Sequence, residues 1–402
     1  LVNAAESFVT QEGFGRDAVA LPLDEHGGTA AALTQSPASQ GLDATRLAAL
    51  DVAIRGGEAP DTTSVLVVHR GKLVHEAYFN GADSTTLHNT RSLTKSVTAM
   101  LVGAAIDRGL IAGGDAKVLG FFPERTPAHP GRFKDATTVE DLLSMSAQWE
   151  CDDNNEYSAG HEERMYVSAD WTGFTLDLPE RGYAPWVKRP ADSPHGRAFA
   201  YCTANSFLLG AIVERASAMP LERFAADALE RPLGISGSVW QHASEGVGMG
   251  GGGTEYRSRD LARLGQLLAD GGRWNGRQVL SPGWVQAMMQ VRAQTPFDAD
   301  YGYQMWRFTI TMGTQELHAW TMSGNGGNAV FVVPDKQLVV VVTRTRYNQR
   351  SNMRENDSMK RSSRPRSFQA SGVTCSASAT SRWNSASISA ANSGPSTTAL
   401  IS

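Results

Sequence analysis

The sequence has little cysteine, with three in 402 residues: Cys151, Cys202 and Cys375. Three cysteines are too few for a disulfide framework, and their spacing lacks the C-x-x-C pairs of metal and redox sites. The nine histidines are scattered and form no H-E-x-x-H pattern, which is the usual signature of one class of zinc enzyme. We therefore predict no metal centre and no cofactor.

The sequence also lacks an excess of positive charge and any long apolar run. Lys and Arg total 37 against 41 for Asp and Glu, and the net charge of −4 does not favour nucleic acid as a partner. The longest apolar stretch, around Leu338–Thr343, is far too short to span a membrane. The first residue is Leu1, so a processed start can hide a signal peptide, and the compartment stays open. The oligomeric state stays open as well.

Composition divides the chain into three parts. Residues 1–45 are rich in Ala, Gly, Thr and Pro without apolar periodicity, and we expect an extended N-terminal arm. Residues 46–348 hold the helix and strand patterns and form the predicted domain. Residues 349–402 are Ser-rich, since the last 52 residues hold 15 of the 35 serines. Such a composition buries too little apolar surface to fold, so we expect disorder there.

The order of the predicted elements indicates the fold class. Residues 64–79 read as a two-stranded hairpin, a helix follows Ser92, another begins at Thr138, and residues 148–196 read as a long polar loop. Further helices are predicted at 205–217, 221–229, 257–269 and 283–290, and strands at 306–311, 316–322, 329–333 and 337–343. Strands at both ends with helices between them predict an α+β fold. Its antiparallel sheet is closed by both ends of the chain, with a mostly helical insertion at about 115–255.

Ser92-Leu-Thr-Lys95, at the start of a predicted helix, is the first candidate for chemistry. A serine hydroxyl needs an adjacent base to become a nucleophile, and a lysine three residues on lies on the same helical face. The helix N-terminus adds free N–H groups beside a developing anion. The alternative is a helix cap followed by a solvated lysine, and this spacing alone favours the alternative.

Two more segments carry candidate residues. Tyr201 precedes a predicted helix, where a hydroxyl near a lysine can act as a base, although a half-buried structural tyrosine is commoner. Ser323, Gly324 and Asn325 form a Gly-rich bend between two predicted strands. Such a bend can offer a backbone N–H to an oxyanion, and the alternative is a simple hairpin turn.

Taken together, these segments resemble the serine β-lactamase-like hydrolases. That superfamily includes class C β-lactamases, penicillin-binding proteins, family VIII esterases and 6-aminohexanoate-dimer hydrolases. The resemblance covers about residues 48–348, and its blocks occur in the order of the family. The blocks are Arg91–Ser96, Thr138–Ser146, Phe199–Gly210, Ile212–Arg215, Pro232–Ile235, Arg257–Gly265 and Ser323–Asn328 followed by Pro334. Tyr201-Cys-Thr-Ala-Asn205 is particularly similar to the Tyr-Cys-Ser-Ala-Asn block of the 6-aminohexanoate-dimer hydrolases.

The resemblance implies a β-lactamase/transpeptidase-like fold and an acyl-enzyme mechanism. It implies that Ser92 attacks a carbonyl while Lys95 and Tyr201 shuttle the proton. The bend residues, Ser323, Gly324 and Asn325, are then expected to bind the substrate and its oxyanion. Burial and the helix N-terminus should lower the pKa of Lys95, because both disfavour its charged form.

Two positions depart from the family pattern. Many members have Asn where this chain has Thr203, and β-lactamases have Lys-Thr-Gly where this chain has Met322-Ser-Gly324. The missing lysine would hold the carboxylate of a β-lactam. We therefore expect hydrolysis of an ester or amide in a small, neutral or zwitterionic substrate. The sequence identifies no separate acidic base for deacylation.

Other functions stay open at this point. One alternative is a β-lactamase or a D-amino-acid peptidase, and another is a catalytically silent binding protein with the same fold. The intact set of Ser92, Lys95 and Tyr201 favours an enzyme. We expect the loop Trp149–Tyr166 and residues near Trp306 to line the substrate pocket. The acidic residues of that loop could attract a cationic amine, although a solvated face is the commoner role.

The end of the chain does not match the family. A helix that covers one face of the sheet is expected after the last strand, yet no amphipathic pattern follows Asn348. We interpret residues from about 350 onward as a non-native ending, as a shifted reading frame would produce. A sheet face left uncovered would then make the protein prone to poor folding or aggregation.

Overall fold

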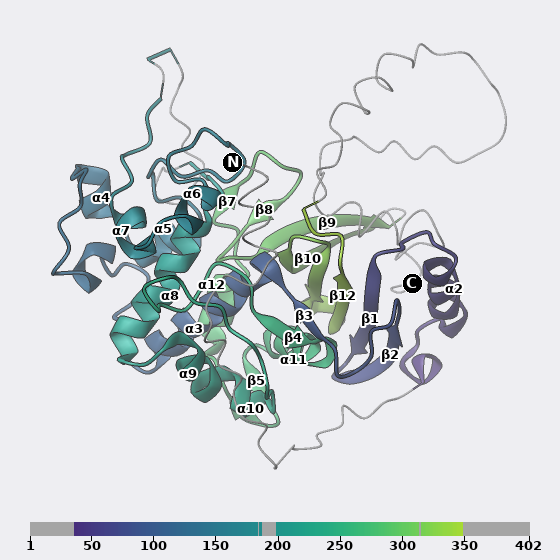
Figure 1. Ribbon diagram of the computed structural model, residues 1–402. Coiled ribbons are helices and arrows are strands. Elements are labelled where there is room, and N and C mark those ends of the chain that lie inside the picture. The colour runs from purple at the N-terminus through teal and green to yellow at the C-terminus, as the bar shows by residue number, and fades with distance from the viewer. Residues whose placement is uncertain (1–35, 184, 187–197, 313–314, 349–402) are drawn as a thin grey trace, which may run out of the picture.

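A computed structural model describes residues 36–183, 185–186, 198–312 and 315–348. An antiparallel sheet lies at one side of the molecule and most of the helices gather at the other (Figure 1). Most of the predicted N-terminal arm and the whole predicted tail, 349–402, lie outside the described residues.

The main sheet has eight strands in the order β2-β1-β12-β11-β10-β9-β8-β7, and all the pairs are antiparallel. The pairing of β1 with β12 joins the two ends of the domain, as the sequence predicts. Its strands are β1 (Thr62–His69), β2 (Lys72–Tyr78), β7 (Ala293–Gln294), β8 (Asp300–Tyr301), β9 (Trp306–Met312), β10 (Gln315–Gly324), β11 (Asn328–Val333) and β12 (Leu338–Arg344). Two small sheets pair β3 (Leu87–Asn89) with β4 (Glu255–Arg257) and β5 (Arg273–Trp274) with β6 (Arg277–Gln278).

Helices contact both faces of the main sheet. On β1, Leu66 and Val68 belong to the large core that includes α11, whereas Val67 faces the other way and shares a cluster with Leu47 of α2. Because both faces are buried, these strands read in the sequence as continuous apolar runs rather than as alternating patterns.

The helices predicted from the sequence are present in the predicted order, and further short helices and helical turns lie between them. They are η1 (Pro37–Gln40), α2 (Ala44–Arg55), η2 (Arg91–Leu93), α3 (Thr94–Asp107), η3 (Val118–Phe121), α4 (Arg132–Ala136), α5 (Val139–Leu143), α6 (Glu162–Tyr166), α7 (Trp171–Leu176), α8 (Thr203–Ser217), α9 (Leu221–Ala225), the π-helical η4 (Ala226–Glu230), α10 (Arg231–Leu233), α11 (Ser258–Ala269), α12 (Pro282–Met288) and η5 (Pro334–Lys336). None of them has the length and apolarity needed to cross a bilayer within the described ranges.

Two long helices, α3 and α8, pack against each other at the centre of the helical side. Both are buried over most of their length, from Thr94 to Ala105 in α3 and from Thr203 to Val213 in α8. A helix buried on all sides shows no clear apolar stripe in its sequence. Both α3 and α8 begin next to candidate catalytic residues, Ser92 and Tyr201 respectively.

The local predictions hold with a few differences. Thr138 caps α5 by accepting a hydrogen bond from the backbone N–H of Asp141, as its hydroxyl predicts. The long polar loop contains two short helices, α6 and α7. At the end of the predicted N-terminal arm, residues 37–40 form a 3-10 helix and α2 already begins at Ala44.

Candidate active site

The site begins at the turn that leads into α3. Ser92 is half-buried in the 3-10 turn η2, and Arg91 before it has a left-handed backbone with φ of +52°. For a residue other than glycine this conformation costs about 1–2 kcal/mol, so surrounding contacts must hold it. The side chains of Thr90, Thr94 and Thr254 supply such contacts through mutual hydrogen bonds of 2.7–3.3 Å.

Lys95 places its amine beside the Ser92 hydroxyl. The Nζ–Oγ distance is 3.1 Å, and the lysine is only 1% exposed. Its Nζ also lies 3.0 Å from Thr203 Oγ1 and 2.5 Å from the Gly251 carbonyl oxygen. An ammonium donates to all three oxygens, whereas a neutral amine donates to two and keeps a lone pair for the Ser92 hydrogen. The geometry therefore suits both protonation states.

Burial changes the acid–base character of Lys95. Removal from water lowers its pKa to about 8, and the nearby carboxyl groups of Glu162 and Asp153 act in the opposite direction. The direction agrees with the prediction from the sequence. A lowered pKa leaves part of the lysine neutral near physiological pH, as a general base requires.

Tyr201 completes the group predicted from the sequence. Its side chain shares a hydrogen bond with Ser92, and its ring centroid lies 5.2 Å from Lys95 Nζ. Burial holds the pKa of Tyr201 far above its usual value, so the phenol keeps its proton near neutral pH. Lys95 can accordingly accept a proton near neutral pH, whereas Tyr201 is present there as the neutral phenol. Trp306 stacks on the ring of Tyr201 at a centroid distance of 5.7 Å.

The predicted bend connects β10 to β11 and approaches the nucleophile turn. A Cβ atom on Gly324 would lie 1.9 Å from the carbonyl oxygen of Thr90, so only glycine permits this approach. Ser323 and Asn325 flank it and are half-buried, and Asn325 Nδ2 donates to Asn348 Oδ1 at 3.0 Å. Met322, which replaces the expected lysine, is fully buried in the core.

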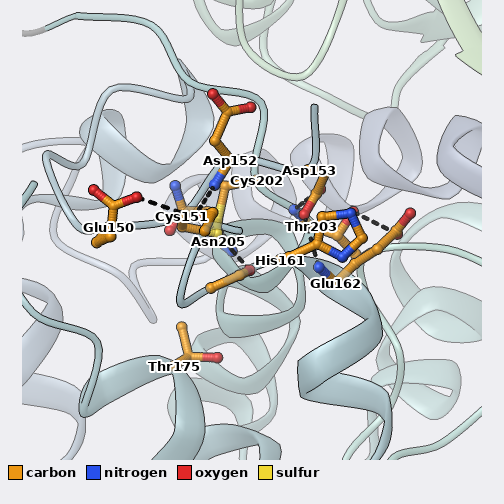
Figure 2. The surroundings of a disulfide bond; sticks show 12 residues. Glu150, Cys151, Asp152, Asp153, His161, Glu162, Thr175, Cys202, Thr203 and Asn205 are labelled. Atoms are coloured by element: carbon orange, nitrogen blue, oxygen red, sulfur yellow. Dashed lines mark hydrogen bonds between the residues drawn. A yellow bond between two sulfur atoms is a disulfide. The ribbon is translucent and has the colours of Figure 1, made fainter. Parts of the chain in front are cut away.

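An acidic pair, Asp153 and Glu162, lies near Lys95 and is not among the site residues predicted from the sequence. Asp153 accepts hydrogen bonds from the backbone N–H groups of Thr203 at 2.6 Å and Glu162 at 3.0 Å, which begin α8 and α6 (Figure 2). Glu162 Oε2 accepts from Thr203 Oγ1 at 3.1 Å. Burial, together with the charge of Glu162, raises the pKa of Asp153. The row of acidic residues was visible in the sequence, but nothing local showed which two turn inward.

The Asp153–Glu162 pair does not form part of a metal site by the usual criteria. Within the described ranges, no three His, Cys, Asp or Glu side chains gather as the ligands of a metal ion would. The two carboxyl groups instead share partners with Lys95 through Thr203.

A disulfide between Cys151 and Cys202 was also not foreseen. The two cysteines are 51 residues apart in sequence, and their Cα atoms lie 5.5 Å apart (Figure 2). Three cysteines were too few for a framework, yet two of them make a single bridge. This bridge joins the loop before Asp153 to the residue between Tyr201 and Thr203, so it ties the acidic pair to the start of α8.

The predicted pocket lining is only partly reproduced. Trp306 lies against Tyr201, and Asp153 and Glu162 of the loop reach the site. Trp149 is instead buried with its ring against Lys134, and Tyr157 is 83% exposed.

Comparison with known proteins places the chain in a family. Residues 53–361 match the Beta-lactamase family. The chain is 29% identical over 268 residues to the 6-aminohexanoate-dimer hydrolase of Paenarthrobacter ureafaciens. That match covers 65% of this chain and 66% of the relative, so the matched part spans just under two thirds of the relative's length.

Solved structures show the same fold at low identity. A family VIII carboxylesterase is similar with a TM-score of 0.56 and 17% identity, covering 80% of this chain and 97% of the other. A penicillin-binding protein homologue from Caulobacter crescentus has a TM-score of 0.56 and 21% identity, covering 76% and 93%. Because the family match spans most of the residues, the chain belongs to the serine beta-lactamase-like hydrolase family.

Proposed function

We propose that this protein hydrolyses an ester or amide bond through an acyl-enzyme formed on Ser92. The observation that carries the proposal is the buried Lys95 amine, 3.1 Å from the Ser92 hydroxyl and beside Tyr201. A serine next to a base of lowered pKa, at the start of a helix, is the arrangement that nucleophilic catalysis requires.

In the first half-reaction the Ser92 oxygen forms a bond to the carbonyl carbon and its proton passes to Lys95. The negative charge that develops on the carbonyl oxygen is stabilised by backbone N–H groups of Ser92 and of a residue near Asn325. The bond to the leaving group then breaks, and the leaving group takes a proton from Lys95 by way of Tyr201. An alcohol or an amine departs, and the acyl group stays on Ser92.

The second half-reaction reverses the proton path. A water molecule forms a bond to the acyl carbon and gives its proton to the neutral Lys95 amine. The bond from that carbon to the Ser92 oxygen breaks, and Ser92 recovers a proton from Lys95. A carboxylic acid is released, and the resting site is restored.

The substrate class follows from what surrounds the nucleophile. Met322 replaces the lysine that holds the carboxylate of a β-lactam, and it is fully buried in the core. Trp306 and Tyr201 provide an aromatic surface next to Ser92. We infer a neutral or zwitterionic ester or amide, which agrees with the names of the similar 6-aminohexanoate-dimer hydrolase and carboxylesterase.

The test compares Ser92→Ala with Ser84→Ala, an exposed serine outside the site, on a short p-nitrophenyl ester. Ser92→Ala should abolish turnover, whereas Ser84→Ala should match the wild type. A fluorophosphonate should label the wild type at Ser92 and should not label the Ser92→Ala variant. Substantial turnover by Ser92→Ala would overturn the assignment of the nucleophile.

The rival functions predict other results. Steady nitrocefin hydrolysis at an enzyme-like rate would favour a β-lactamase, and release of D-amino acids from peptides would favour a peptidase. A silent binding protein would leave Ser92 unlabelled by both fluorophosphonate and penicillin.

A further inference from the structure

Thr203 is a buried hydroxyl with two ionisable neighbours. It is 1% exposed, so its hydroxyl is shielded from solvent. Its Oγ1 lies 3.0 Å from Lys95 Nζ and 3.1 Å from Glu162 Oε2. This one hydroxyl therefore connects the amine beside Ser92 to a carboxyl group on α6.

Counting hydrogens fixes the direction of the chain of hydrogen bonds. A threonine hydroxyl has one hydrogen to donate, and an ionised carboxylate can only accept. The Thr203 hydrogen must then point to Glu162, which leaves an oxygen lone pair facing Lys95. Lys95 in turn donates to Thr203 and to the Gly251 carbonyl, so the remaining position on its nitrogen faces Ser92.

We propose that Glu162 and Thr203 are positioning residues that orient the Lys95 amine toward Ser92 and stabilise it after it has taken the serine proton. The inference rests on the proposed function and assigns a role to the acidic pair. Glu162 touches neither Ser92 nor the reacting atoms and acts through the Thr203 hydroxyl. Asp153 supports this arrangement by binding the first backbone N–H of both α6 and α8.

Several charged or titratable groups face Lys95. They are Ser92 in η2, Tyr201 just before α8, Asp153 in the loop before α6, and Glu162 in α6. Asp153 and Glu162 are the two groups that favour the charged form of the lysine, against the effect of burial. Tyr166 donates a hydrogen bond to Glu162 at 2.9 Å and so helps to hold that carboxyl group.

The charge of Glu162 has a measurable consequence. Replacing it by glutamine keeps an oxygen that can accept from Thr203 but removes a negative charge near Lys95. The ammonium form then becomes less favourable, and the amine stays neutral to lower pH. Removing one negative charge from the surroundings of a buried lysine lowers the pKa of its amine by about one unit, and the midpoint of the pH profile moves with that pKa.

The experiment measures the rate of Ser92 labelling by a fluorophosphonate between pH 5.5 and 10, on the full chain. In this reaction the serine oxygen forms a bond to phosphorus, fluoride leaves and the serine proton passes to Lys95. Glu162→Gln should move the midpoint of the pH profile about one unit lower than in the wild type. The matched control is Glu163→Gln, the adjacent acid on α6, and it should leave the midpoint unchanged.

Thr203 provides a second arm that does not depend on the charge variant. Thr203→Val should lower the plateau labelling rate at least tenfold, and Thr203→Ser, which keeps the hydroxyl, should restore most of it. Thermal unfolding of each variant verifies that it is folded. An unchanged or raised midpoint in Glu162→Gln, or wild-type labelling of Thr203→Val, would overturn the inference. An unlabelled Ser92 in the wild type would instead overturn the proposed function itself.

Discussion

Lys95 shows at the scale of a single residue how burial produces chemistry. Only the neutral amine can accept the Ser92 proton, and burial brings the pKa of this lysine to about 8 from an ordinary value of 10.5. The rate of Ser92 labelling in the wild type should therefore rise with pH and reach half of its plateau near pH 8. It should be lost as the pH falls through that value, because the lysine is then charged.

The measurement is the labelling rate across the pH range in a buffer of constant ionic strength. Lys95→Met, which keeps an unbranched side chain of similar length but has no amine, should be slow at every pH. A wild-type midpoint near 10.5 would show that burial does not lower the pKa of this lysine.

Gly324 tests the approach of the sheet to the nucleophile turn. Gly324→Ala places a methyl group 1.9 Å from the Thr90 carbonyl oxygen. The backbone of Gly324 and the backbone of Thr90 are each held by hydrogen bonds, so neither can move away easily. The turn before Ser92 must move, so we expect a loss of stability of about 1–3 kcal/mol and at least a tenfold slower labelling of Ser92. Urea unfolding and the labelling rate measure the two effects.

The matched control for this change is Gly283→Ala in α12. A Cβ there meets no atom within 4 Å, and alanine favours a helix over glycine, so stability should stay the same or rise slightly. If Gly324→Ala behaves like Gly283→Ala, the contact with Thr90 does not constrain the site.

Residues close in sequence were the easiest to predict. Ser92 and Lys95 are three positions apart on one helix, so their contact follows from helical geometry. Tyr201 lies more than 100 residues away, and only its resemblance to a family block indicated a place beside them. Asp153 and Glu162 lie in a loop for which the sequence favours a solvated acidic face. Their inward orientation depends on distant partners at the start of α8, which the local sequence does not reveal.

At the scale of elements, long helices and strands with apolar side chains were predicted within a few residues. The exceptions have physical reasons. In α2 only Leu47 and Ile54 are buried, which is too sparse to show a helical period. The strands β7 and β8 have two residues each, and their pairing depends on the neighbouring strand rather than on their own sequence.

The disulfide joins two elements of the site and gives the next prediction. Breaking the Cys151–Cys202 bridge frees the Asp153 loop from the start of α8, so the acidic pair and Tyr201 should lose their relative positions. In a Cys375→Ser background, the Cys151→Ala/Cys202→Ala variant should lose about 2–4 kcal/mol of stability. Its labelling of Ser92 should also be slower than that of the single Cys375→Ser control.

Thiol counting provides the check on this prediction. The Cys375→Ser protein, denatured without reductant, should show no free thiol when it is produced in an oxidising compartment, where such bridges persist. Two free thiols there would show that the bridge does not form. Equal labelling rates with and without the bridge would show that it does not hold the site together.

At the scale of the whole molecule, the sheet depends on a strand from late in the chain. β12 lies between β1 and β11, and its residues bury side chains on both faces of the sheet. Val339 and Val341 join the large core, whereas Val340 joins the cluster on the α2 side. The prediction of a sheet closed by both ends of the chain is confirmed, because segregated strands at the two ends have few other ways to bury their edges.

Truncation tests this dependence together with the expectation about the tail. A chain ending at Gln337 lacks β12, so β1 and β11 each lose one of their two neighbouring strands, and the four buried apolar side chains of Leu338–Val341 are removed. At about 1.5–3 kcal/mol each, that loss is comparable to the stability of a whole domain, so this chain should not fold.

A chain ending at Asn348 keeps every pair of the sheet, and we expect it to fold and to label at Ser92 like the full chain. Circular dichroism, thermal unfolding and fluorophosphonate labelling of the two truncations and the full chain make the comparison. If the chain ending at Asn348 unfolds as the shorter one does, residues beyond 348 contribute packed structure, and our interpretation of the Ser-rich ending is wrong.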